Sequence, residues 1–211
     1  MGDASIVFYN VENLFDTINE PEKRDEGFLP ESEKEWNTQR YQDKLDKLAE
    51  VITHRQVKNP LFIGLAEVEN RFVVRDLLKT GGLSETKYRV AHFDSPDVRG
   101  IDVALAFDHK RFHMTHKEAI PIELDEDSNF KTRDILYVKG VFYDSTEVHV
   151  FVNHWSSRRG GQEASEHKRI RAAKVLRGYV DSLQAIDDQT NIIIMGDFND
   201  YPSNLSINEV L

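Results

Sequence analysis

The chain contains no cysteine among its 211 residues. Disulfide bonds and thiolate metal sites are therefore excluded, and any metal ion must be held by oxygen atoms or imidazole nitrogens. The absence of cysteine does not indicate a compartment, because a protein without cysteine is compatible with oxidising and reducing surroundings alike.

Basic residues are in the minority. The 27 lysines and arginines face 37 aspartates and glutamates, which gives a formal net charge of −10 at pH 7. This balance argues against capture of nucleic acid by a broadly basic domain. It does not exclude a nuclease, because a bound divalent cation and a few local arginines can supply positive charge at the site itself.

Long apolar segments are missing as well. No apolar run approaches the length that spans a bilayer, and no signal peptide is visible. We therefore expect no membrane span, and the compartment stays open between a cytoplasmic protein and an exported one whose signal has been removed. No repeat or linker-like segment divides the chain. We expect a single domain over residues 1–211, and a monomer.

The first third of the chain has the pattern of a parallel strand-helix-strand unit. Residues 5–11 are apolar and β-branched, as is typical of a strand. Residues 38–56 place apolar side chains on one face and charged ones on the other, which predicts a helix with Thr38 as its N-cap. Residues 61–66 form the next apolar strand, so this unit predicts a parallel crossover.

Short strands and one long helix dominate the rest of the chain. The pattern predicts helices over residues 71–79 and 164–183, and strands over residues 88–93, 101–107, 135–143, 148–154 and 191–195. Hairpin-like and crossover connections are mixed among them. The sequence therefore predicts an α/β domain with mixed parallel and antiparallel sheets.

Four of these strands finish on polar groups. Asn10 ends the first strand, Glu67 ends the second, His154 ends a later one, and Asp197 and Asn199 follow the last. The ends of adjacent strands gather at one edge of a sheet, where α/β proteins commonly bind ligands. Carboxylates and amides form an all-oxygen set suited to Mg²⁺ or Mn²⁺, and imidazole can carry protons near neutral pH. The combination suits hydrolysis of a phosphate ester.

Each of these residues also has a simpler interpretation. Asn10 can close a turn, and Glu67 can cap the next helix or remain a solvated surface acid. His154 can be a core histidine whose ring is hydrogen-bonded, and Asp197 with Asn199 can form an Asx turn. The functional interpretation depends on their joint occurrence at strand ends.

Five segments form a longer pattern, in this order along the chain: YNVENLF (9–15), GLAEVEN (64–70), RGIDVALAF (99–107), FVNHWSSRRGG (151–161) and MGDFND (195–200). This set resembles the motifs of the endonuclease/exonuclease/phosphatase family. The resemblance implies a deoxyribonuclease-I-like fold, a four-layer αββα sandwich of two mixed β-sheets. It also implies a hydrolase, endonuclease-like, that uses Mg²⁺ or Mn²⁺ to cleave a phosphodiester substrate such as nucleic acid by attack of water.

The resemblance further assigns roles to the polar strand ends. Glu67 would be a metal ligand, and Asn10 would help to hold the metal or a phosphate oxygen. Asp197 would orient or activate the attacking water, and Asn199 would bind the phosphate in its transition state. His154 matches the histidine that nucleases of this family use for proton transfer to the leaving group.

Further candidates lie close to these motifs. By resemblance, Arg133 stands where the family places a phosphate-binding arginine. Arg158 and Arg159 lie on a glycine-bearing loop directly after His154, where they could clasp a phosphate. Asp102 could orient the imidazole of His154, as the acid of a catalytic triad does, or it could be a surface acid at a strand edge.

One part of the family pattern is missing. The family closes with an S-D-H motif, and none stands before Leu211, because the Asp108-His109 pair follows a different strand. We therefore expect a chain that is incomplete at its C-terminus and that as given lacks full activity. Two alternatives stay open: a non-catalytic module that binds a phosphate ligand or a protein, and, for an enzyme, a small phosphodiester or lipid head group as substrate.

Overall fold

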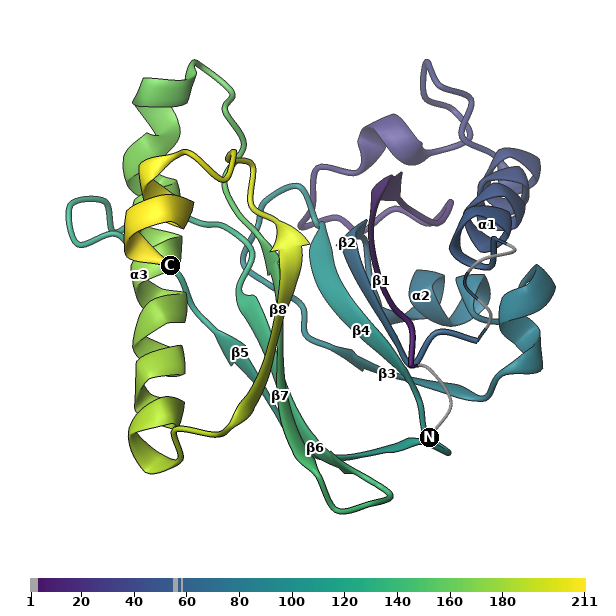
Figure 1. Cartoon of the computed structure of the whole chain (residues 1–211). Helices are drawn as coiled ribbons and strands as arrows, with labels where there is room; N and C mark the ends of the chain where they lie inside the picture. Colours follow the sequence, from purple (N-terminus) through teal and green to yellow (C-terminus); the bar gives the residue numbers. More distant parts are fainter. Residues whose placement is uncertain (1–3, 55–56, 58) are drawn as a thin grey trace.

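Two four-stranded sheets form the centre of the molecule (Figure 1). The computed structural model describes residues 4–54, 57 and 59–211. The first sheet has the order β1 (Ile6–Leu14), β2 (Phe62–Val68), β4 (Asp102–Asp108) and β3 (Tyr88–His92). The second has the order β5 (Phe112–Ile120), β6 (Ile135–Phe142), β7 (Glu147–His154) and β8 (Asn191–Asp197).

Both sheets are mixed, as expected. β1 pairs with β2 in parallel, β7 pairs with β8 in parallel, and the other pairs are antiparallel. Each parallel pair is joined by a crossover helix, α1 (Thr38–Ile52) in the first sheet and α3 (Gln162–Ile186) in the second. Because the strands of a parallel pair share one direction, their C-terminal ends leave the sheet at the same edge.

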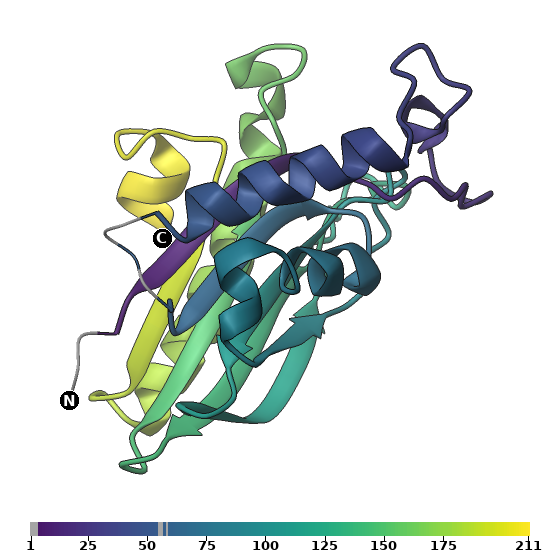
Figure 2. The same cartoon turned by 90° about the vertical axis from the view of Figure 1, so that its right-hand side faces the viewer.

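Helices cover the outer faces of both sheets. Figure 2 shows α1 and the shorter α2 (Arg71–Leu77) in front of the first sheet, and Figure 1 shows α3 along the second. The described residues also form three short helical turns, η1 (Glu26–Phe28), η2 (Gly81–Glu85) and η3 (Ser206–Val210). The expected four-layer αββα sandwich is confirmed. Within the described part of the chain, no helix combines the length and the apolar character needed to cross a membrane.

Apolar side chains fill the three spaces between the four layers. One cluster lies between α1, α2 and the first sheet, and another between the second sheet and α3. The middle cluster joins the two sheets and includes Phe62, Leu105, Val150 and Met195. Full burial of one such side chain stabilises the fold by roughly 1.5–3 kcal/mol. The middle layer therefore fixes the distance between the two sheets.

The first helix differs from its prediction at both ends. Its N-cap is Asn37, whose side-chain oxygen accepts a hydrogen bond from the Arg40 backbone N–H at 3.1 Å, so Thr38 is the first helical residue and not the cap. The helix ends at Ile52. The predicted end near Gln56 lies outside the described residues.

Strand β5 was not predicted. Its exposed positions include His113, Thr115 and His116, and this polar character hides the strand pattern. β5 pairs with β6 alone and forms one edge of the second sheet, where an outer face can stay in contact with water. An edge strand therefore needs few of the apolar residues by which strands are recognised.

Candidate active site

The C-terminal ends of β2, β7 and β8 and the middle of β1 bring polar side chains of both sheets together. The prediction that Asn10 ends the first strand is wrong, because β1 continues past a register shift to Leu14. Nδ2 of Asn10, on β1, donates a hydrogen bond to Glu67 Oε1 at 3.3 Å and another to Asp197 Oδ2 at 3.0 Å. Glu67 belongs to β2 and Asp197 to β8. One amide thus links two carboxylates across the boundary between the sheets, as expected if the strand ends gather at one edge.

Two shifts in strand register within the first sheet direct the side chains of Asn10 and Glu67 toward each other. The pairing of β1 with β2 shifts after Asn10, and the pairing of β2 with β4 shifts between Ala66 and Val68. A bulge of this kind turns a side chain away from its regular direction. Glu67 lies at the second bulge with φ of 65°, in the left-handed region that residues with a side chain rarely adopt. Such backbone strain often occurs at functional sites.

Gly196 allows β8 to pass close to β7 just before Asp197. A Cβ atom at this position would meet the backbone oxygen and the Cβ atom of Asn153. Asn153 is fully buried, and its side chain donates a hydrogen bond to the Met195 carbonyl at 3.2 Å. The glycine therefore sets the close approach of the two strands that carry His154 and Asp197.

His154 lies beside Glu67, with 3.7 Å between His154 Nε2 and Glu67 Oε1. The residue is only 4% exposed. Burial, together with the positive charges of Arg133 and Arg99, lowers the pKa of His154 to about 3. In the protein without ligands, the imidazole is therefore neutral near pH 7.

Arg133 is buried beneath His154 rather than open to a ligand. Its guanidinium donates to the carbonyls of His154 at 3.2 Å and Trp155 at 2.6 Å, and to Asp97 Oδ2 at 2.8 Å. Burial opposes the charge of Asp97, but the ion pair with Arg133 holds the pKa of that carboxyl below its usual value. In this arrangement Arg133 positions the end of β7, and its predicted contact with phosphate remains untested.

Arg99 is a residue that our sequence analysis missed. Its guanidinium lies 3.3 Å from Asp97, its side chain is 45% exposed, and its charge contributes to the lowered pKa of His154. The signal was present, because Arg99 begins the RGIDVALAF segment. Asp97, which holds both Arg99 and Arg133, lies outside the five motif segments.

Asp102 does not contact His154, so the predicted orienting role has no support in the structure. Asp102 Oδ1 accepts hydrogen bonds from the Ser95 N–H at 2.9 Å and from the Ser95 hydroxyl. Its Oδ2 lies 3.3 Å from His92 Nε2, without hydrogen-bond alignment. Asp102 is 2% exposed, so it is not the surface acid of the alternative interpretation either.

His92, Asp94 and Asp102 form a separate group of possible metal ligands. One ligand atom from each of these residues lies within 4.8 Å of the others. Asp94 is exposed, whereas His92 and Asp102 are buried. Among the described residues, this is therefore a group whose geometry suits a metal ion, and it does not include the carboxylates that Asn10 joins.

The loop after β8 folds back onto the loop after β7. Asn199 donates its backbone N–H to Asp197 Oδ1 and its side-chain amide to the Trp155 carbonyl, both at 3.0 Å. Arg158 donates to the Asn199 carbonyl at 2.8 Å and to Asp200 at 3.2 Å. The Asx turn of the simpler interpretation is therefore present. Beside it opens a hollow of about 460 Å³ whose lining includes Arg158, Asp197 and Asn199.

These features agree with the comparison of the sequence with known families. The chain matches the Endonuclease/Exonuclease/phosphatase family over residues 5–211 and belongs to that family. The match includes all the strands that carry the candidate site.

Solved structures with the same fold are distant in sequence. The human Nocturnin catalytic domain with bound sulfate is 20% identical, with a TM-score of 0.59 over 78% of this chain and 60% of that one. A D. rerio TDP2 complexed with single strand DNA product is 16% identical, with a TM-score of 0.60 over 98% of this chain and 64% of that one. A family member from Bacteroides thetaiotaomicron is 15% identical, with a TM-score of 0.63 over 97% of this chain and 65% of that one.

The chain thus spans about two thirds or less of the length of these three structures. At such identities the similarity establishes the fold and leaves the substrate open. A comparison with curated proteins found no match.

Proposed function

We propose that this chain carries the catalytic centre of a divalent-metal-dependent phosphodiester hydrolase. The observation that supports this proposal most directly is the hydrogen bonding of Asn10 to both Glu67 and Asp197. Three separate strands, from two sheets, place these groups at one point. Chance surface polarity has no reason to produce such a convergence, whereas a hydrolytic centre requires it.

The carboxylates of Glu67 and Asp197 fit a hard divalent cation. Each lies within 3.3 Å of the same amide nitrogen, and among the described residues neither forms an ion pair with lysine or arginine. Oxygen ligands of this kind are those that Mg²⁺ and Mn²⁺ prefer. A bound cation would neutralise phosphate oxygens and polarise the ester. Asn10 Oδ1 accepts the Glu12 N–H at 2.9 Å, so in this orientation Asn10 holds the ligands in place.

The side chains around the cation would position the reactants. Asp197 can accept a hydrogen bond from the attacking water and so direct it at phosphorus. His154, neutral in the free protein, can donate its single ring N–H to a phosphate oxygen or accept a proton from water. Asn199 uses one amide hydrogen on Trp155 and keeps the other for the phosphate.

Arg99 is better placed than Arg133 to contact the phosphate. The donors of Arg133 are directed at two carbonyls and Asp97, and its side chain is 4% exposed. Arg99 is tethered to the same carboxylate but remains 45% exposed. We therefore add Arg99 to Arg158 as a candidate phosphate-binding residue.

Nucleic acid is the substrate class that we favour. The family match and the TDP2 structure, which was solved with a single strand DNA product, support this choice. A small phosphodiester or a lipid head group is the alternative, because the residues above recognise a phosphate group and not a base or a lipid.

The test is hydrolysis of bis-p-nitrophenyl phosphate, plasmid DNA and a phospholipid by the purified protein, including any residues that follow Leu211 in the natural chain. We expect turnover that requires Mg²⁺ or Mn²⁺ and stops with EDTA. Glu67→Ala and Asp197→Ala should each lower the rate by on the order of 10²–10⁴-fold, because each removes a positioned charged group.

Glu50→Gln is the matched control, since it removes one exposed carboxylate near the C-terminal end of α1, where the chain leads to the start of β2 and not to its end at Glu67. It should leave the rate unchanged. Binding of phosphate ligands without turnover on any of the three substrates would contradict the proposal and favour a non-catalytic module.

A further inference from the structure

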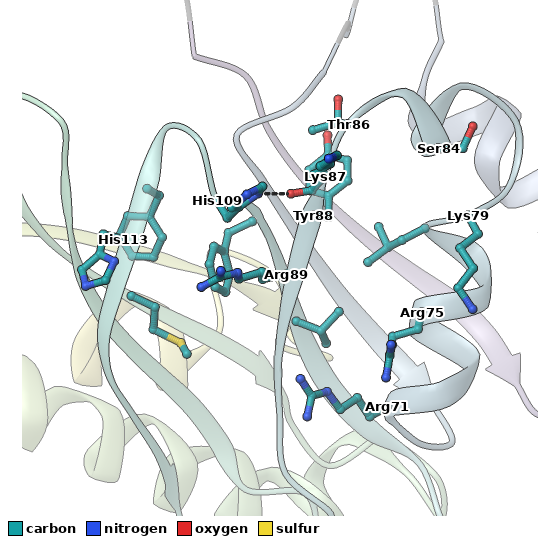
Figure 3. Close-up of a pocket in the computed structure, with 15 residues that line it drawn as sticks. Arg71, Arg75, Lys79, Ser84, Thr86, Lys87, Tyr88, Arg89, His109 and His113 are labelled. Atoms are coloured by element: carbon teal, nitrogen blue, oxygen red, sulfur yellow. Dashed lines mark hydrogen bonds between the residues drawn. The ribbon is translucent and has the colours of Figure 1, made fainter.

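A basic cleft lies between the edge strands of the two sheets, β3 and β5, where α2 flanks it (Figure 3). Its volume is about 830 Å³, within the range of sites that hold small ligands. No residue that we place in the candidate active site lines it. The cationic residues in its lining are Arg71, Arg75, Lys79, Lys87 and Arg89.

The charge of this cleft is opposite to that of the chain. The lining contains these five cations and no aspartate or glutamate, whereas the whole chain has a formal charge of −10. All five cations are exposed. Of these five cations, Lys79 forms an ion pair, with 3.3 Å between its Nζ and Asp76 Oδ1. The other four form no ion pair with a carboxylate of the described residues. Unpaired like charges around one hollow repel each other, and a bound anion would relieve the repulsion.

The arrangement of the cations suits a row of phosphates. Arg71 and Arg75 are four residues apart on α2 and therefore lie on one side of the helix, about 6 Å apart along its axis. Lys79 lies just beyond the end of α2, and Figure 3 shows all three along the α2 side of the cleft. Arginine contributes a planar fork of donors that matches phosphate oxygens in pairs.

The remaining lining can receive the bases of a nucleic acid. It includes the partly exposed ring of Tyr88, with exposed His113 on the opposite wall, whereas Phe107 and Phe112 lie buried beneath the surface. Flat apolar and imidazole surfaces beside a positive row are the combination by which proteins hold single strands.

We propose that this cleft is a second binding site, which holds a short stretch of single-stranded nucleic acid by its phosphates. A flat membrane surface fits less well, because the cations line a hollow. An acidic peptide fits less well too, because carboxylate side chains on one strand alternate between two faces, whereas phosphates form a continuous row. The proposal concerns binding alone and does not depend on hydrolysis at the candidate active site.

The test is fluorescence anisotropy of a labelled oligothymidylate of about 20 nucleotides, in EDTA so that no cleavage occurs. Salt is varied from about 50 to about 200 mM. We expect binding that weakens with salt, and a decrease of at least about tenfold in affinity for Arg75→Gln/Arg89→Gln. The salt dependence should also become shallower, by about 0.7 in slope for each phosphate that the variant no longer binds.

The control variant is Arg40→Gln/Lys174→Gln, which removes two exposed cations from α1 and α3 and changes the net charge equally. It should bind like the unchanged protein. Arg71→Gln/Lys79→Gln, which changes two different cations on the α2 side of the cleft, should reproduce the decrease in affinity. Agreement between the two variants would show that the decrease does not come from misfolding caused by one particular substitution. Equal decreases in cleft and control variants would overturn the proposal, as would tighter binding to poly-glutamate or to phosphatidylserine vesicles than to the oligonucleotide.

Discussion

Asn10 holds the two carboxylates of the candidate site at a fixed distance. Its two amide hydrogens are directed at Glu67 and Asp197, and its oxygen accepts the Glu12 N–H. An amide is neutral, so it satisfies both acids without cancelling their charge. The negative charge of the pair therefore stays available for a cation.

Asn10→Asp tests this role. The substitution keeps the shape but replaces two donors with a third acid, so we expect a loss of about 1–3 kcal/mol of stability without divalent cations. Mg²⁺ should raise the melting temperature of the variant by more than that of the unchanged protein, because a cation relieves the added repulsion. Thermal denaturation in EDTA and in Mg²⁺ measures both effects.

Asn191→Asp is the control, because Asn191 also donates through its side chain but to the Glu147 carbonyl at the start of β7. Mg²⁺ should not restore its stability. An equal response of the two variants to Mg²⁺ would show that Asn10 does not mark a cation site.

At the scale of elements, the regular pairing of β2 is interrupted at Glu67, and this interruption sets the direction of the Glu67 side chain. Its backbone enters the left-handed region at Glu67, where the bulge turns the carboxylate toward Asn10. A side chain in this conformation costs about 1 kcal/mol or more, and glycine avoids the cost.

We therefore expect Glu67→Gly to be more stable than Glu67→Ala by about 1 kcal/mol, in chemical denaturation without metal. Both variants lack the carboxylate, so only the Cβ atom differs between them. In a regular strand the order is reversed, and Glu118→Gly should be less stable than Glu118→Ala in β5. If alanine were the more stable residue at position 67, the strain at the bulge would be absent in solution.

Elements with regular apolar patterns were predictable from sequence, and those that depend on distant partners were not. Residues 5–11, 61–66 and 191–195 are short apolar runs, and each lies within or beside an observed strand. β5 was missed because an edge strand carries polar residues on its open face. The cap at Asn37 was missed because Asn37 and Thr38 are both good capping residues.

At the scale of the whole molecule, the pairing of strands and the contacts between loops decide which residues become partners. Asn10, Glu67 and Asp197 were identified because each ends an apolar run, a signal that sequence contains. The partners of Asp102 follow from the antiparallel pairing that sets His92 opposite Ala104, and those of Arg133 follow from its contact with the loop that carries Asp97. Such pairings are not encoded in local spacing.

The stability of the whole fold should fall in acid because of His149. Burial in β7 and the charge of Lys139 lower the pKa of His149 below 6.5, against the opposing effect of Glu147. The unfolded chain therefore takes up a proton below about pH 6.5 that the folded protein rejects, so stability is kept above this pH and lost as the pH falls.

His149→Gln removes this proton uptake and should reduce the loss of unfolding free energy between about pH 7.5 and about pH 5. Glutamine can keep a hydrogen bond to the Tyr137 hydroxyl, which lies 2.7 Å from His149 Nδ1. Exposed His113→Gln serves as the control. Denaturant titrations at the two pH values measure the difference, and parallel losses in all three proteins would contradict the prediction.

The middle apolar layer acts as a spacer for the candidate site. Met195, two residues before Asp197, packs so closely on Gly64, three residues before Glu67, that a Cβ atom on the glycine would meet its sulfur. The Met195 side chain thus lies between β2 and β8, the strands that carry the two carboxylates, and its thickness affects how closely they approach. At the proposed cation site, a change of side-chain size at position 195 should therefore alter the preference among ions of different radius, with Glu67 and Asp197 unchanged.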